Sequence, residues 1–155
     1  MGGKVFSTGT APLYTPRMSP TVYELARNNC TDALKGLGFS RIAIPIEAPE
    51  KDSFGDVDIL LCLERTKFPP SAKFDASLWG QIEKALLAVR SHSWVRFGPD
   101  KQRIIDNKSF AIHWPTVPAT NPAGQKKEPV AESKPQYVQV DVRLCDTDQD
   151  MDWRL

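Results

Sequence analysis

Two aspartates, Asp56 and Asp58, stand two residues apart at the start of an apolar run that ends at Leu63. The Phe54-Gly55 pair before them is a turn signal, and the run itself is rich in strand-forming residues. Because side chains alternate along a strand, both carboxylates point to one face, roughly 6.5–7 Å apart along the chain. Two fixed carboxylates repel each other, so one keeps its proton or a cation lies between them. Oxygen ligands at this spacing suit magnesium, manganese or calcium.

A purely structural role for these acids is the alternative, because Asp is common in turns and at strand starts, where it bonds nearby backbone. A second strand at residues 137–145 favours the metal. Its apolar residues alternate with polar ones, and the polar side chains share one face: Gln139, Asp141 and Arg143. An Asp in the middle of a strand is unfavourable. A metal shared with Asp56 and Asp58 would explain why Asp141 stands there.

A helix and a short strand are predicted before the acidic strand. Ser19 followed by Pro20 predicts a helix start, because Ser caps the first turn and Pro suits the first helical position. Apolar residues at helical spacing continue to about Leu37, where two glycines predict the end. Residues 41–47 read as a short strand that Pro45 interrupts or confines to the edge of a sheet.

The rest of the chain reads as an arm, loops and shorter elements. Residues 1–18, rich in Gly, Pro, Thr and Ser, predict an extended N-terminal arm, and the domain spans 19–155. A second helix is expected over 77–90, with an apolar stripe that reaches Val89. The proline-punctuated tract 115–136 reads as a flexible loop between two strands. The remaining predictions are a loop at 65–77, strands at 94–97, 104–105 and 109–114, and a helix start within 146–155.

Composition places the chain among globular proteins. Its 155 residues suggest one domain, and its apolar content of 41% and charged content of 25% are ordinary. A net charge of +1 supplies no strong field toward nucleic acid or a membrane. No apolar run approaches the ~20 residues of a membrane helix. The three cysteines lack C-x-x-C spacing, so reduced thiols in a cytoplasmic or nuclear protein are expected: Cys30, Cys62 and Cys145.

The acidic strands carry a resemblance to a known superfamily. A Gly-Asp-x-Asp motif before an apolar strand, with a third Asp between apolar residues of a later strand, resembles the nucleotidyltransferase superfamily. That superfamily includes DNA polymerase beta, poly(A) polymerases and CCA-adding enzymes. The chain is similar to fungal and phage members in further segments as well. The matching segments are Gly2-Gly3-Lys4-Val5-Phe6, Pro16-Arg17-Met18, Lys51, Gly55 to Asp58 and Gln139-Val140-Asp141.

The resemblance implies an α+β, nucleotidyltransferase-like fold, in which two helices flank a small mixed β-sheet. It implies that Asp56, Asp58 and Asp141 are catalytic and bind Mg²⁺ or Mn²⁺. The expected reaction transfers a nucleoside monophosphate from a nucleoside triphosphate to the hydroxyl of an acceptor, which is RNA, a protein or a small molecule. Related nucleotidyltransferases continue into further helices that hold the base and the acceptor, so the domain is expected to be incomplete at its C-terminus.

The turn before Asp56 is where the resemblance places the phosphates of the nucleotide. The family carries an apolar-Gly-Gly or apolar-Gly-Ser pair shortly before the first acid, whereas this chain has no Gly between Ile44 and Ala48. Lys51 and Ser53 are expected to substitute, as a point charge and a hydroxyl beside the metal. Together with Gly55 of the acidic motif, they form the predicted nucleotide-binding residues.

Two other functions stay open at this point. The first is a catalytically inactive nucleotidyltransferase-fold domain that acts as a nucleotide-, RNA- or protein-binding scaffold, which the absent Gly pair and the near-neutral charge favour. The second is a regulatory or toxin–antitoxin type nucleotidyltransferase that modifies a protein or a small molecule, which suits the small size. Asp141 favours an enzyme, because a mid-strand carboxylate without a metal lowers stability on a buried face.

Overall fold

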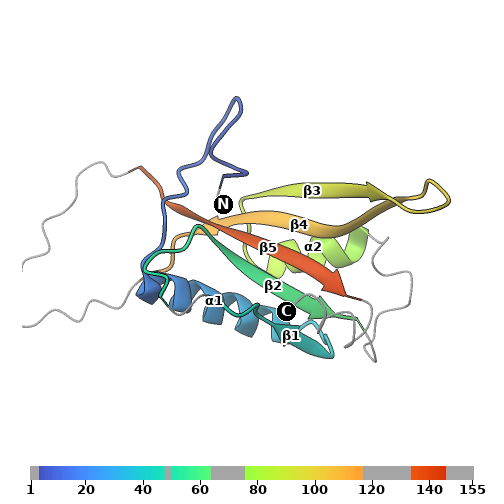
Figure 1. The fold of residues 1–155 in the computed structure, drawn as a ribbon, viewed down its shortest axis with the longest axis horizontal. Coiled ribbons are helices and arrows are strands. Elements are labelled where there is room, and N and C mark those ends of the chain that lie inside the picture. Colours follow the sequence, from blue (N-terminus) through green and yellow to red (C-terminus); the bar gives the residue numbers. More distant parts are fainter. Residues whose placement is uncertain (1–3, 48–49, 64–75, 117–133, 146–155) are drawn as a thin grey trace, which may run out of the picture.

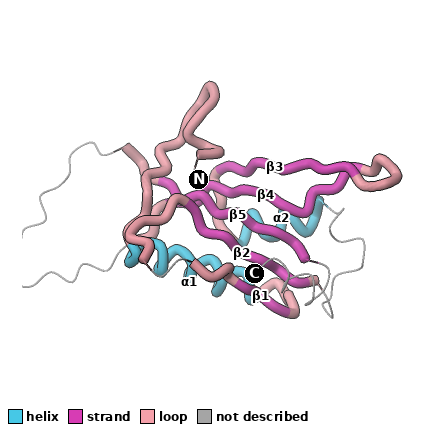
Figure 2. Tube along the Cα trace, in the orientation of Figure 1, coloured by secondary structure: helices cyan, strands magenta, loops and turns pink. Residues whose placement is uncertain are grey.

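A computed structural model describes residues 4–47, 50–63, 76–116 and 134–145. Within these residues there are two helices, α1 (Pro20–Lys35) and α2 (Ala76–Ala85). The strands are β1 (Arg41–Ala43), β2 (Asp56–Cys62), β3 (Arg90–Phe97), β4 (Arg103–His113) and β5 (Tyr137–Cys145). Figure 1 and Figure 2 show the sheet with both helices on one side of it. Neither helix of the described chain has the length and hydrophobicity needed to cross a bilayer.

The strands form one mixed sheet in the order β1-β2-β5-β4-β3. β2 and β5 run parallel, and the other three pairings are antiparallel. Because a parallel pair needs a long crossover, the chain passes through α2, β3 and β4 before β5 returns beside β2. The α+β class and the mixed sheet predicted from the sequence are confirmed.

The hydrophobic core lies between the helices and one face of the sheet. Alternate residues of the central strands are buried there, as the alternating pattern of β2 and β5 predicts. The fully buried residues of β2, β5 and β4 include Val57, Ile59, Leu61, Val140, Val142 and Phe110. The side chains between them in the sequence therefore point to the other face of the sheet. This face carries no described helix and is called the open face below. Asp56, Asp58 and Asp141 are among these side chains.

Local signals set the bounds of α1 much as predicted. The Ser19 side chain accepts a hydrogen bond from the backbone N–H of Val22 at 3.3 Å, which caps the first turn. The helix ends at Lys35, two residues before the predicted Leu37, because Gly36 forms the C-cap. The following Gly38 has a φ of 92°, a left-handed conformation that favours glycine.

The N-terminal arm packs onto the domain through two of its side chains. Phe6 and Met18 are buried, although residues 4–18 contain no helix and only isolated bridges. Met18 exchanges two backbone hydrogen bonds with Phe54, of 2.7 Å and 2.9 Å. This pairing ties the end of the arm to the turn that leads into β2, so the arm helps to fix the start of the acidic strand.

The second helix is shorter than the sequence predicted. It ends at Ala85 instead of residue 90, because Leu87 takes a left-handed φ of 54° that breaks the helix. The backbone N–H of Val89 then donates to Ala111 of β4 at 2.8 Å, so the chain has already joined the sheet. Val89 was expected in the buried stripe, but its side chain is 45% exposed.

The strands also differ from the sequence prediction in length. β1 stops at Ala43 instead of residue 47, before Pro45, which cannot donate to a ladder. β3 begins at Arg90 instead of Trp94, and the two fragments at 104–105 and 109–114 are parts of the single strand β4. The predicted helix start within 146–155 and most of the loops at 65–77 and 115–136 lie outside the described residues.

Candidate metal centre

Three carboxylates converge on the open face of the sheet. The parallel pairing of β2 with β5 places Asp58 directly beside Asp141, and Asp56 lies two residues earlier on the same face of β2. Neighbouring strands are about 4.8 Å apart, so the pairing alone brings two carboxyl groups together. One oxygen atom from each of the three acids lies within 4.8 Å of the others. The convergence predicted from the sequence is therefore present.

Two of the acids, Asp56 and Asp58, have raised pKa values in this half-buried site. Burial, together with the charges of Asp58 and Asp141, raises the pKa of Asp56 to about 7, and Lys51 opposes the rise. Burial also raises the pKa of Asp58, with Asp141 next in importance. Raised pKa values mean that negative charge at this place is disfavoured without a compensating cation.

Asp141 is held by donors that are themselves buried. Within the described residues, the buried polar side chains are Ser109, 1% exposed, and Gln139, 3% exposed, and both donate to Asp141. The Ser109 hydroxyl donates to Asp141 Oδ1 at 2.6 Å, and Gln139 Nε2 lies 3.0 Å and 3.3 Å from the two Asp141 oxygens. Further out, Gln139 Oε1 accepts from the backbone of Val5, and Ser109 Oγ accepts from Trp94 Nε1 at 2.9 Å.

Replacing Ser109 by Ala is expected to weaken Mn²⁺ binding about tenfold, because residues that hydrogen-bond a metal ligand keep it oriented. The free energy of unfolding is expected to fall by about 1–2 kcal/mol, since the buried groups lose a partner. Calorimetric titration and thermal unfolding measure the two effects. Ser93→Ala is the matched control, because Ser93 pairs with Lys108 on the helix side of the same hairpin. Equal Mn²⁺ affinity in both variants would contradict this role of Ser109.

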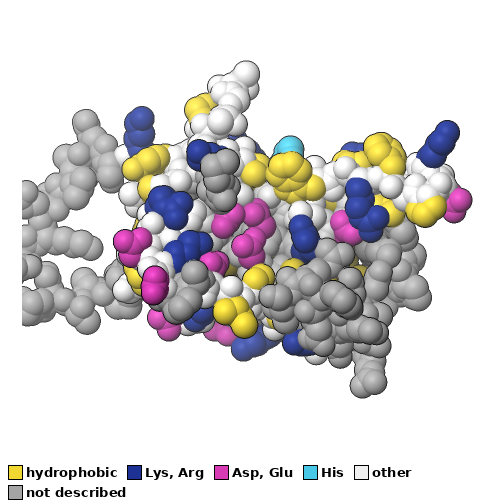
Figure 3. All heavy atoms as spheres, in the orientation of Figure 1, with side chains coloured by type: hydrophobic (Ala, Val, Ile, Leu, Met, Phe, Trp, Pro, Cys, Tyr) yellow, Lys and Arg dark blue, Asp and Glu magenta, His cyan; other side chains and the backbone are white. Residues whose placement is uncertain are grey.

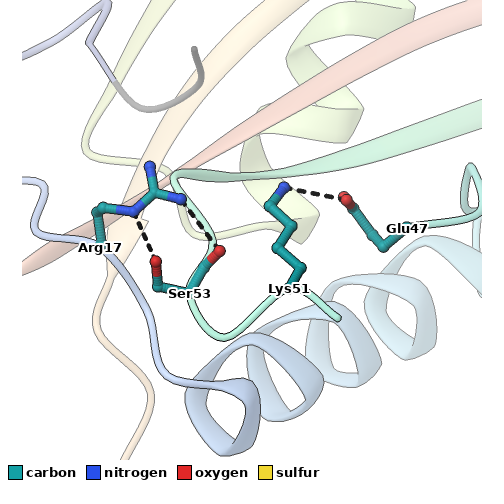
Figure 4. A network of polar contacts seen from close by, with 4 residues as sticks. All are labelled: Arg17, Glu47, Lys51 and Ser53. Atoms are coloured by element: carbon teal, nitrogen blue, oxygen red, sulfur yellow. Dashed lines mark hydrogen bonds and ion pairs between the residues drawn. The ribbon is translucent and has the colours of Figure 1, made fainter. Parts of the chain in front are cut away.

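The residues of the turn before β2 are engaged in polar contacts of their own (Figure 4). Lys51 Nζ lies 3.0 Å from a carboxylate oxygen of Glu47. Arg17 donates to the Ser53 hydroxyl at 2.8 Å and to the Ser53 carbonyl at 3.0 Å. Gly55 is buried directly before β2. Of the predicted nucleotide-binding residues, Lys51 therefore lies close enough to oppose the charge of the acids, whereas Ser53 fixes the arm to the turn.

Two cavities lie beside the acids and share Pro45 in their walls. The smaller, of about 170 Å³, is lined by Asp58 and Asp141 together with Asn107 and Arg143. The larger, of about 500 Å³, lies between α1 and the segment before β2, and its lining includes Tyr23, Arg27, Glu47 and Lys51. Arg143 thus lines the smaller cavity, and Arg27 and Lys51 line the larger one.

Tyr23 carries a buried polar atom that the described residues leave unpaired. Its hydroxyl has no hydrogen-bond partner among them. Its ring stacks on the ring of Phe54, with the two ring centroids 4.0 Å apart. Burial and, after it, the charge of Glu47 raise the pKa of Tyr23 to about 12. The hydroxyl is therefore a donor at the wall of the larger cavity.

Sequence reasoning found the three acids but missed several of their neighbours. It placed Gln139 and Arg143 on the face of Asp141 without giving them a role in the site. Ser109 carried no local signal, because only the register of β4 against β5 sets it opposite Asp141. Tyr23 and Arg27 likewise reach the site from α1 through packing, which the helical pattern alone does not reveal.

The donor set fits a hard divalent cation. It offers carboxylate oxygens from three residues within 4.8 Å, and Mg²⁺, Mn²⁺ and Ca²⁺ prefer oxygen ligands. The hydrogen bonds from Ser109 and Gln139 hold the Asp141 carboxylate in place. Neither a protein-family model nor a curated protein matches this chain, so the chemistry of the site rests on its own residues.

Proposed function

We propose that this chain has a nucleotidyltransferase-like fold and transfers a nucleoside monophosphate from a nucleoside triphosphate to a hydroxyl acceptor, with Mg²⁺ or Mn²⁺. The observation that carries this proposal is the meeting of Asp56, Asp58 and Asp141 on the open face of two parallel strands. The raised pKa of Asp56 supports it, because the cluster is disfavoured until a cation neutralises it.

The three acids divide two tasks in the proposed reaction. Asp56 and Asp58 hold the cation, and Asp141, fixed by Ser109 and Gln139, also orients the acceptor hydroxyl. The acceptor oxygen bonds to the α-phosphorus, the bond from that phosphorus to the pyrophosphate oxygen breaks, and the hydroxyl proton is released. When bound, the divalent cation stabilises the charge that develops on the phosphate oxygens. Positioning and charge stabilisation carry most of the rate in such transfers.

The larger cavity is the proposed place of the triphosphate. Arg27 and Lys51 supply positive charge there, and the unpaired hydroxyl of Tyr23 supplies a donor. Phosphate oxygens accept such charge-assisted hydrogen bonds well. These side chains would perform the task that the family assigns to its Gly-Gly or Gly-Ser pair, which this sequence lacks.

A second candidate function is an inactive scaffold that binds a nucleotide, RNA or a protein. The ion pair between Lys51 and Glu47 and the contact between Arg17 and Ser53 favour it, because phosphates would have to compete with these partners. An inactive scaffold would keep the acidic cluster but would catalyse no transfer. An assay of the reaction therefore distinguishes the two functions, whereas a binding assay does not.

Pyrophosphate release separates the two functions. The full chain is incubated with each of the four ribonucleoside triphosphates and Mn²⁺, together with a mixture of RNA oligonucleotides and protein acceptors. An active transferase releases pyrophosphate and transfers label from the α-phosphate, and the Asp141→Asn variant does neither. Asp106→Asn is the control, because Asp106 pairs with Arg96 at 2.7 Å in the β3–β4 hairpin. Nucleotide binding without release from any triphosphate would support the scaffold instead.

A further inference from the structure

Arg143 lies beside the acidic cluster, on the open face of β5. It comes two residues after Asp141 in the same strand, so both side chains point to this face. Across the sheet, the register pairs Arg143 with Leu60 of β2 on one side and with Asn107 of β4 on the other. Figure 3 shows acidic side chains near the centre of the open face, with basic side chains close beside them. A positive charge and an amide are therefore placed directly next to the acids.

The polar groups of Arg143 and Asn107 are half-buried but not used within the described chain. Among the described residues, neither the guanidinium of Arg143 nor the side-chain amide of Asn107 has a hydrogen-bond partner, and Arg143 forms no ion pair. The charge of Arg143 only opposes the rise in the pKa of Asp58. A guanidinium carries five N–H donors, and a donor withdrawn from water without a partner lowers stability. These donors are available to a ligand.

The cavity that the two side chains share suits a small anion. Its volume is about 170 Å³, and Pro45 and Leu60 form apolar parts of its wall. One water molecule takes up roughly 30 Å³ in the liquid, so the cavity has room for a carboxylate or a phosphate group. The planar guanidinium matches two oxygens of either group with two parallel N–H donors. An apolar wall strengthens such hydrogen bonds, because it reduces screening by water.

The position of Arg143 relative to Asp141 relates this cavity to the proposed reaction. Two residues of one strand are roughly 6.5–7 Å apart, which is the span of a few covalent bonds. In the proposed reaction Asp141 orients the acceptor hydroxyl. One small molecule can therefore place its hydroxyl at Asp141 and an anionic group at Arg143. A divalent cation held by the acids would offset their repulsion of that anion, because a bound cation is the largest local charge in such a site.

We propose that Arg143 and Asn107 bind the carboxylate or phosphate group of the acceptor, which makes the acceptor a small anionic alcohol such as a hydroxy acid or a sugar phosphate. Arg143 holds the anion by its charge and its paired donors, and Asn107 adds an amide N–H. The identification of the ligand as the acceptor rests on the proposed function, whereas the anion site itself does not.

Anion binding can be measured apart from the metal and from the reaction. Inorganic phosphate and, separately, acetate are titrated into the isotope-labelled full chain in EDTA at pH 6, and the backbone amide NMR signals are followed. At this pH the cluster carries less negative charge, because the pKa of Asp56 is about 7. The signals of Asn107 and Arg143 are expected to shift. A response to phosphate alone assigns the acceptor to phosphorylated alcohols, and a response to acetate alone assigns it to hydroxy acids.

Four variants test which side chains hold the anion. Arg143→Gln is expected to weaken binding about tenfold or more, because charge-assisted hydrogen bonds are lost. Arg143→Lys keeps the charge without the planar donors and is expected to retain part of the affinity. Asn107→Ala is expected to weaken binding about threefold, through one neutral hydrogen bond. Arg103→Gln is the matched control, because it removes the same charge from an exposed residue at the tip of the β3–β4 hairpin, and its affinity is expected to equal that of the wild type.

The outcomes separate this inference from the proposed function. No response of Asn107 and Arg143 to either anion would overturn the inference, as would equal weakening in Arg143→Gln and Arg103→Gln. Shifts confined to Arg27 and Lys51 would assign the anion to the larger cavity and would also overturn it. Because EDTA removes the metal, anion binding in a chain without transferase activity would uphold the anion site and refute only its use for an acceptor. An active transferase whose Arg143 binds no anion would contradict the inference alone.

Discussion

Asp58→Asn is expected to lower the rate of nucleotidyl transfer about a thousandfold or more, while the metal-free variant becomes more stable than the wild type. The loss follows from removing a charged ligand: a factor of a thousand corresponds to about 4 kcal/mol of transition-state stabilisation. The gain in stability follows from the electrostatics of the apo site, where burial and the charge of Asp141 raise the pKa of Asp58. An amide removes that repulsion, for a gain of about 1 kcal/mol in a half-buried site.

Transfer of label from the α-phosphate and thermal unfolding in EDTA measure the two effects. Asp32→Asn serves as the control, because Asp32 is an exposed acid of α1 that pairs with Lys35 at 3.5 Å. It is expected to change neither quantity appreciably. Loss of activity with a matching loss of stability would indicate a folding defect. Wild-type activity in the Asp58→Asn variant would rule out the proposed role of this acid.

The metal-free protein is expected to lose stability as the pH rises from about 4 to about 7. The folded pKa of Asp56 is raised to about 7, above the value of about 3.9 in an unfolded chain. Between these pH values the folded state binds more protons, so the free energy of unfolding falls with rising pH and levels off above pH 7. Solvent screening of the half-buried site limits the fall to about 2 kcal/mol.

Urea unfolding in EDTA at a series of pH values measures this dependence. The comparison is with Asp56→Asn, which keeps all other titrating groups of the chain. The stability of this variant relative to the wild type is expected to grow as the pH rises. Saturating Mg²⁺ is expected to restore the stability of the wild type at pH 7.5. A difference between the two proteins that stays constant with pH would show that Asp56 does not titrate with a raised pKa.

Local sequence signals predicted the parts of the fold that local physics decides. Ser19 and Pro20 mark the start of α1, and the alternation in residues 137–145 matches the buried face of β5. The same alternation, with the resemblance to nucleotidyltransferases, led to the expectation that Asp141 meets Asp56 and Asp58. That meeting depends on the parallel pairing of two strands far apart in the sequence, and the observed register provides it.

Contacts between distant parts of the chain set the element bounds that local signals did not predict. The pattern after α2 looked helical through Val89, but hydrogen bonding to β4 and the left-handed Leu87 end the helix earlier. β4 looked like two fragments because polar residues interrupt its apolar pattern, yet pairing with β3 and β5 on both sides carries the strand through them. The β-bulge that shifts the register of β4 against β3 has no local sequence signal at all.

The most direct test of the account is calorimetric titration of Mn²⁺ into the wild type and into Asp58→Ala, each with and without a non-hydrolysable nucleoside triphosphate analogue. We predict that the wild type binds Mn²⁺, that the analogue tightens this binding, and that both effects disappear in Asp58→Ala. Wild-type protein that binds no Mn²⁺, or binding that survives unchanged in Asp58→Ala, would contradict a metal centre at Asp56, Asp58 and Asp141.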